Sequence, residues 1–446
     1  MASRLLPALL LALSAGALKA QAPAPSPVRL SFADAIRQAT GATEAPPPAV
    51  ELAGLRTDES RARVKQARSG LLPSFSLAGS WANRTLNPKA LGFTGASFPL
   101  PSLIGPFDVV DARAQFQQTL FDLSNLKRVS AAKNQVTASM AEGSATAEAS
   151  AQTVALAYAR ATRAQAVVSA RAADSSLAAE LVKVAVAQQQ AGVSASIDVT
   201  RARVQLSESE GRVILAQSQL ERARIDLARA LGIDAVTPIE LVDTLSAELG
   251  AADVPADRNA AVAQGIASRP DLAAEVARGN AARTGASAIS AERLPRVAVA
   301  ADYGLSGNQF PDAISTRSVG VQVSLPLLDG WHREGRLAEQ RAVAQASDVR
   351  ARDLRQQVVA DVDGALLDLR SASAQQMISR ERLRLAAEEV SQARQRFQAG
   401  VAGNIEVINA QESLVRAREA DIDARYAALA AKIALARSVG SAHTLH

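Results

Sequence analysis

The chain has 446 residues, no cysteine, a formal net charge of +5 and only 3% aromatic residues. The lack of cysteine excludes disulfides, thiolate metal sites and a lipid-modified N-terminal cysteine. Basic and acidic residues alternate along the helical stretches, which is typical of a solvated surface and argues against a nucleic-acid partner. The apolar residues are mainly Ala, Val and Leu, a composition that suits long helices packed through small side chains.

Residues 1–20 have the pattern of a secretory signal peptide. Arg4 supplies a basic start, residues 5–13 an apolar centre, and residues 15–22 small side chains suited to cleavage. The apolar run is shorter than the roughly 20 residues of a transmembrane helix, and no later stretch is apolar enough. We therefore expect an exported protein that could enter a membrane only as strands.

Two regions predict shorter helices. Residues 30–36 form a short amphipathic pattern capped by Ser31, and residues 49–70 resume a helical pattern. Their counterpart is the segment 260–292, which is interrupted at residues 268–271.

Four segments alternate between apolar and polar residues with a period of two, namely 74–81, 110–117, 297–303 and 318–325. Strands of about 9–11 residues with one apolar side are what the wall of a membrane barrel requires. Ten of the 14 aromatic residues fall in and around these segments, as expected for interfacial girdles or a packed core. Four strands cannot close a barrel, since the smallest have about eight, so several chains would share one.

Very long helices are predicted by the absence of proline between Pro106 and Pro238 and after Pro326. A helix from Asn125 to Ala191 would be roughly 100 Å long at 1.5 Å per residue. The return helix repeats apolar or small residues at 3-4 spacing, which favours winding against a neighbour. These residues are Val199, Ala202, Leu206, Ser209, Val213, Ala216, Leu220, Ala223, Leu227 and Ala230.

The chain is an internal duplication with an offset of 208 residues. Residues 191–232 align with 399–440 without a gap and share 15 identities in 42. The identities include Gly192 with Gly400, so the turn at the end of each long helix recurs. A period this long indicates two copies of a large motif.

Each turn carries an acid close to the start of the return helix. Gly192 and Gly400 are placed to end the long helices in the left-handed conformation, and Ser196 and Asn404 are predicted N-caps. Two residues after each of these caps stand the acids Asp198 and Glu406. One interpretation is a helix-start acid that meets the helix dipole. The other is a ring of acids that screens what passes through a tunnel mouth.

No pattern predicts an enzyme, a cofactor or a metal site. The three histidines His332, His443 and His446 are scattered, and the last two lie on a C-terminal tail expected to be mobile. No phosphate loop, Cys/His cluster or nucleophile motif occurs.

Several local motifs in this order resemble the outer membrane efflux protein family, the TolC-like exit ducts. They include Leu71-Leu-Pro73, Ser268-Arg-Pro-Asp-Leu272, Leu294-Pro295, Leu325-Pro-Leu-Leu-Asp329 and the two tip turns with Ala202 and Ala410. The resemblance covers nearly the whole mature chain. It implies a mainly α fold of long coiled-coil hairpins with four β-strands per chain, a homotrimer with a shared twelve-stranded barrel in outer-membrane lipid, and a periplasmic tunnel of twelve helices. Its implied partners are a periplasmic adaptor protein and an inner-membrane pump.

On this basis the chain divides into eight regions. They are a signal peptide (1–20), a linker with equatorial helices (21–70), a first hairpin of strands (71–122), a first long helical hairpin (123–232), a second linker with helices (233–293), a second hairpin of strands (294–329), a second helical hairpin (330–440) and a tail (441–446).

At the tips the sequence departs from the family pattern. Ala402 stands where such ducts carry an arginine, and Asn409 where they carry an inner aspartate, so gating by an aspartate ring is not expected. Asp198, Arg201, Glu406 and Asn409 are the candidate pore-lining residues. The residues expected to touch an adaptor are Gly192, Val193, Ser194, Gly400, Val401 and Ala402.

Two alternatives to a small-molecule efflux duct remain. The same architecture serves the outer-membrane duct of one-step (type I) protein secretion. A periplasmic coiled-coil adaptor or scaffold with soluble hairpins belongs to another class, but it needs neither four strands of lipid-crossing length nor a duplicated order.

Overall fold

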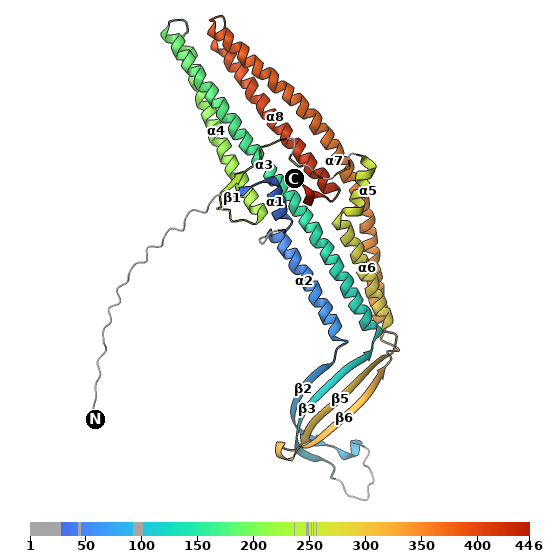
Figure 1. The fold of residues 1–446 in the computed structure, drawn as a ribbon. Coiled ribbons are helices and arrows are strands. Elements are labelled where there is room, and N and C mark those ends of the chain that lie inside the picture. Colours follow the sequence, from blue (N-terminus) through green and yellow to red (C-terminus); the bar gives the residue numbers. More distant parts are fainter. Residues whose placement is uncertain are drawn as a thin grey trace, which may run out of the picture.

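The computed structural model describes residues 28–42, 46–91, 101–235, 237–246, 249–250, 252, 254–255 and 257–446. The molecule is long and narrow, with a β-sheet at one end, two helical tips at the other, and short elements grouped around the middle (Figure 1). We call this middle region the equator. The predicted signal peptide lies outside the described residues.

Four long helices form two hairpins that run to the tips. They are α3 (Leu123–Gln190), α4 (Ser196–Leu231), α7 (His332–Gln398) and α8 (Asn404–Ser438). The 68 residues of α3 confirm the predicted rod. It begins at Asp122, whose carboxylate accepts a hydrogen bond from the backbone N–H of Asn125 at 3.0 Å. None of the described helices combines the length and the apolar character needed to cross a membrane.

The two hairpins pack on each other through α3 and α8, which lie between α4 and α7 (Figure 1). The predicted seam of α4 points inward, because Val199, Ala202 and Leu227 are at most 5% exposed. Near the tips, residues from all four helices form one apolar cluster. Its buried members are Leu181, Ala185, Val199, Ala202, Ala386, Val390, Ala393, Phe397, Val407, Ala410, Leu414 and Ala417. The abundance of alanine allows the four axes to approach closely.

The sheet at the other end has four antiparallel strands in the order β2-β3-β5-β6. Their bounds are β2 (Ser74–Leu86), β3 (Ile104–Phe121), β5 (Arg296–Gly307) and β6 (Ile314–Ser324), with 3-10 turns η1 (Pro88–Leu91) and η2 (Phe310–Asp312) after β2 and β5. The register places Phe75 opposite Phe116, and Phe116 opposite Ala301. All three belong to the predicted apolar side, so the predicted apolar positions of neighbouring strands share one face of the sheet, and the four predicted strands are confirmed.

The equator holds a core that the strand pattern did not predict. The short strands β1 (Val28–Leu30) and β4 (Ile239–Leu241) pair in parallel. Tyr158 of α3 is fully buried beside them, and its hydroxyl donates to Leu30 O at 3.0 Å and to Asp243 Oδ2 at 2.9 Å. Its ring meets Phe32 edge-on. These contacts anchor the first residues of the described chain to the middle of the long rod.

Four shorter helices pack against the long ones. They are α1 (Phe32–Ala39), α2 (Pro48–Ser69), α5 (Arg258–Ser268) and α6 (Pro270–Ala291). Ser31 caps α1 as predicted, because its hydroxyl accepts from the N–H of Asp34 at 3.1 Å. The predicted break at residues 268–271 separates α5 from α6 at Arg269, directly before Pro270.

The C-terminal tail is not mobile, and the expectation that it would be is wrong. Residues Ala442–Thr444 form a 3-10 turn, η3, in which Ala442 is fully buried. The buried carboxylate of Glu148 on α3 accepts the backbone N–H of Ala442 at 2.9 Å and contacts the ring of His443. The sequence pattern missed this contact because Glu148 lies 294 residues away in the chain.

Candidate functional site at the helical tips

Both long helices end in the same hydrogen-bonded turn. Gly192 and Gly400 have φ angles of +71° and +72°, as predicted. The N–H of Val193 donates to Gln188 O at 3.0 Å, and the N–H of Val401 donates to Arg396 O at 3.1 Å. This is the Schellman arrangement, in which a left-handed glycine lets the chain cover the last carbonyls of the helix.

Ser196 and Asn404 are not N-caps, which corrects the prediction. They are the first residues of α4 and α8, and the cap positions are occupied by Ala195 and Gly403, neither of which has a side chain that can accept a hydrogen bond. Asn404 instead links the two hairpins: its side-chain amide donates to the backbone oxygen of Asp198 at 2.7 Å, and the residue is fully buried.

The four candidate pore residues are distributed over two local groups. Asp198 and Arg201 lie one turn apart on α4, with 3.9 Å between Oδ1 and Nη1. Glu406 makes a closer ion pair, 2.9 Å, with Nε of Arg396 at the end of α7. Asn409 is exposed on α8. The structure thus brings Asp198 to Arg201 but does not pair Glu406 with either of them.

Arg396 is a tip residue that the sequence reasoning missed. It lies in the last turn of α7, where a cation is favourable near the carboxyl end of a helix, and it holds the first-turn acid of α8. The position of Arg396 four residues before Gly400 carries no distinctive local signal. Only the turn geometry brings its guanidinium over the start of the next helix.

The outermost surface of the tips is apolar and exposed. Val193 is 74% exposed and Val401 is 69% exposed. Gly192 and Gly400 beside them have open space around their Cα atoms, and Ser194 and Ala402 are half-buried. Two equivalent, exposed valines therefore project from two equivalent turns.

A second polar group, also missed, lies on the polar face of the sheet. Arg113 of β3 forms ion pairs with Asp111, at 2.9 Å, and with Asp302 of β5. Its guanidinium also donates to the hydroxyl of Thr316 on β6 at 3.2 Å. The two strands approach closely beside Arg113, where a Cβ at Gly304 would lie 2.5 Å from Ala112 O and 2.9 Å from Arg113 Cα. Three strands thus share one charged cluster on the face opposite the exposed aromatic rings.

No group of His, Asp or Glu within the described ranges could hold a metal ion. The titratable groups of the tips belong to ion pairs and helix ends, and we find no nucleophile–base pair among them.

Solved structures with this fold are outer-membrane channels. The channel VceC of Vibrio cholerae superposes with a TM-score of 0.73, over 92% of this chain and 96% of that chain, at 20% identity. The open-state MtrE channel of Neisseria gonorrhoeae gives a TM-score of 0.72 over 93% and 89% of the two chains, at 17% identity. The chain therefore shares the fold of these channels over nearly its whole length.

The chain belongs to the outer membrane efflux protein family, whose model matches residues 43–233 and 261–441. Membership confirms the resemblance and assigns the protein to the outer membrane of a Gram-negative cell. Among curated proteins, it is 24% identical over 262 residues to the pyoverdine export outer membrane protein OpmQ of Pseudomonas putida, covering 57% of this chain and 54% of OpmQ. It is 31% identical over 252 residues to the protein CyaE of Bordetella pertussis, covering 51% of each. The chain spans about half the length of these curated relatives.

Proposed function

We propose that three copies of this chain form the passive exit duct of a tripartite efflux system. The duct takes small molecules from an inner-membrane pump, through a periplasmic adaptor, across the periplasm and the outer membrane. Energy comes from the pump, and this chain contributes a tunnel and its mouth. The protein needs no cofactor for this role.

The observation that carries the proposal is an apolar sheet that one chain leaves open. Phe75, Leu77 and Val319 are between 77% and 84% exposed on its apolar face. The outer strands β2 and β6 each pair on one side only, and unpaired strand edges inside a bilayer are costly. Three copies of four strands would supply twelve, enough for a closed barrel.

Small molecules are the favoured cargo because one relative is named for the export of pyoverdine. The duct of type I protein secretion is the alternative, since the same architecture serves both. The pump that works with the duct distinguishes the two functions. Restoration of drug efflux together with a proton-driven pump and its adaptor would support small-molecule efflux. Export of a protein together with an ATP-driven exporter would support type I secretion.

The assembly is tested by expressing the full chain in a Gram-negative host and separating the membranes. We expect a heat-modifiable trimer that detergent extracts from the outer membrane and that conducts ions in planar bilayers. Recovery of a folded monomer in the osmotic-shock fraction would contradict the duct and favour the periplasmic scaffold.

The tip acids are tested by single-channel selectivity. If Asp198 and Glu406 line the mouth, the double variant Asp198→Ala with Glu406→Ala should lose preference for cations, because fixed negative charge concentrates them. The control is Glu339→Ala, an exposed acid on α7 far from the tips. Unchanged selectivity would leave both acids as helix-start residues.

The adaptor surface is tested at the two exposed valines. Val193→Asp with Val401→Asp should abolish efflux in cells that contain the adaptor and pump, because a carboxylate cannot be buried in an apolar contact without a large cost. Trimer yield and conductance of the purified protein should stay unchanged. Full efflux activity would exclude these turns as the docking surface.

A further inference from the structure

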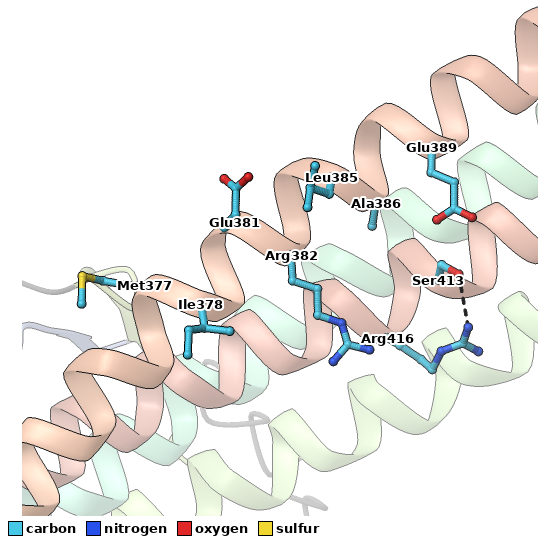
Figure 2. A pocket seen from close by; sticks show the side chains of 9 residues that line it. All are labelled: Met377, Ile378, Glu381, Arg382, Leu385, Ala386, Glu389, Ser413 and Arg416. Atoms are coloured by element: carbon cyan, nitrogen blue, oxygen red, sulfur yellow. Dashed lines mark hydrogen bonds between the residues drawn. The ribbon is translucent and has the colours of Figure 1, made fainter.

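The outer edge of the second hairpin carries a groove that the chain itself does not fill. It has a volume of about 670 Å³, and Figure 2 shows its side chains along one side of α7 and on α8. Its lining includes Met377, Ile378 and Arg382 of α7 and Arg416 of α8. Met377 and Ile378 are 70% and 64% exposed, which is unusual for two adjacent large apolar side chains.

The internal duplication indicates what belongs in this groove. An offset of 208 residues carries α3 onto α7 and α4 onto α8. Inside the chain, the hairpins meet where α3 packs against α8. The equivalent meeting, α7 against α4, does not occur within one chain, because these helices lie at opposite edges (Figure 1). The groove is thus the second instance of an interface whose first instance is filled by α8.

Three ion pairs cross the filled interface between α3 and α8, and the most buried of them involves Asp174. Asp174 of α3 pairs with Arg418 of α8, and the Asp174 side chain is only 8% exposed. Beside this pair, Ile422 of α8 is 9% exposed, within the core cluster that includes α3. These contacts provide the template for the unfilled interface.

The unfilled interface has the same pair with the charges exchanged. The residue 208 positions after Asp174 is Arg382, and the residue 208 positions before Arg418 is Glu210. Both are exposed, and within the described part of the chain neither has an ion-pair or hydrogen-bond partner. A swap of signs that keeps a pair complementary is expected where two positions meet.

The apolar contact is repeated as well. Ile214 of α4 is equivalent to Ile422 and is the same residue type. Ile422 is 9% exposed, whereas Ile214 is 67% exposed and lies beside Leu215 at 65%. An isoleucine that is buried in one copy of the motif and exposed in the other lacks a neighbour that the assembly would provide.

We propose that α4 of a second copy of this chain fills the groove on α7, so that Arg382 pairs with Glu210 of the partner subunit and Ile378 packs against Ile214 of the partner subunit. The contact joins two different surfaces, so repeating it generates a ring. This inference rests on the proposed trimer and specifies which residues join its subunits.

Cross-linking tests the geometry directly, because the chain has no cysteine of its own. Arg382→Cys with Glu210→Cys, treated in the membrane with a short bismaleimide, should give covalent dimers and trimers. Asp174→Cys with Arg418→Cys should link only within one chain. Arg380→Cys with Glu210→Cys is the negative control, since Ala172, the equivalent of Arg380, is exposed outside the α3–α8 contact.

Charge exchange tests the pairing. Arg382→Glu and Glu210→Arg should each lower the temperature at which the detergent-solubilised trimer dissociates, and the double variant should recover most of the loss. Arg380→Glu, an equal charge change two residues away, should have little effect.

The outcomes separate this inference from the proposed function. A conducting trimer that gives no intersubunit cross-link and no recovery in the double variant would overturn the pairing and leave the duct intact. Absence of any trimer in the unmodified protein would overturn the duct itself.

Discussion

Arg269 illustrates how a short sequence motif acquires a physical role. It occupies the break between α5 and α6, and only 6% of its side chain is exposed. Its guanidinium forms ion pairs with Asp271, at 2.7 Å, and with Asp361 of α7, at 2.6 Å. The motif at residues 268–272 thus joins an equatorial helix to the second long rod.

This cluster predicts a pH-dependent contribution to stability. Burial alone would raise the pKa of the Asp271 carboxyl, but the hydrogen bonds and the positive charge of Arg269, together with the backbone N–H of Leu272, hold that pKa below its usual value of 3.8. A group whose pKa is lowered by folding stabilises the fold above its unfolded pKa and loses that effect as pH falls through the folded pKa. Asp271→Asn should therefore lower the unfolding temperature at neutral pH, with a difference from the parent protein that shrinks below about pH 4.

The measurement is thermal unfolding followed by circular dichroism in detergent at several pH values. Asp353→Asn, an exposed aspartate on α7, serves as the control and should have no effect at any pH. If the difference in unfolding temperature between Asp271→Asn and the parent protein stays constant at acid pH, the loss of stability comes from packing and the charge of the carboxylate does not cause it.

At the scale of elements, two glycines at helix ends allow the cost of a left-handed backbone to be compared with the cost of a steric clash. Gly192 and Gly232 end α3 and α4 with φ angles of +71° and +73°. A Cβ at Gly192 meets open space, whereas a Cβ at Gly232 would lie 2.8 Å from Cδ of Pro48 at the start of α2. The two positions therefore share the strain and differ in their surroundings.

Gly192→Ala should destabilise the protein by about 1–2 kcal/mol, the cost of a left-handed alanine. Gly232→Ala should cost clearly more, because α2 must also move. Chemical unfolding of the two variants under identical conditions measures the difference. Equal losses would mean that the contact with Pro48 adapts without cost.

At the scale of the whole molecule, the tips of the two hairpins pack against each other through a shared buried cluster. Val199 and Ala202 of α4 share one buried cluster with Val407 and Ala410 of α8. Both hairpins must therefore have matching lengths above the equator. The chain meets this requirement because the two tip turns, at Gly192 and Gly400, and the two helix ends, at Gly232 and Gly440, are separated by the same 208 residues.

Removing two helical turns from each of α3, α4, α7 and α8 should leave a folded trimer that is shorter by about 10 Å. The same deletion in α3 and α4 alone should separate the tip cluster and lower the dissociation temperature of the trimer. Electron microscopy measures the length, and heating in detergent measures stability. A stable trimer after the one-sided deletion would show that the two hairpins do not depend on each other.

The sequence by itself determined the long helices, the four strands of the large sheet, the duplication and the left-handed glycines of the tip turns. Period-two alternation, long proline-free runs with regular apolar spacing, and glycines at helix ends are local signals, because backbone geometry imposes them within a few residues. Arg382 and Glu210 also become visible once the two halves are aligned. The proposed roles of the tip residues stay predictions.

Only the tertiary structure decided which distant side chains meet. Nothing near Glu148 indicates that it holds the C-terminal turn, nothing near Arg396 indicates that it holds Glu406, and nothing near Arg113 indicates that Asp302 of another strand pairs with it. The strands β1 and β4, three residues each, are too short to leave a pattern. Such contacts depend on how whole rods and strands lie against each other, and a small shift in packing moves a charged side chain from one partner to another.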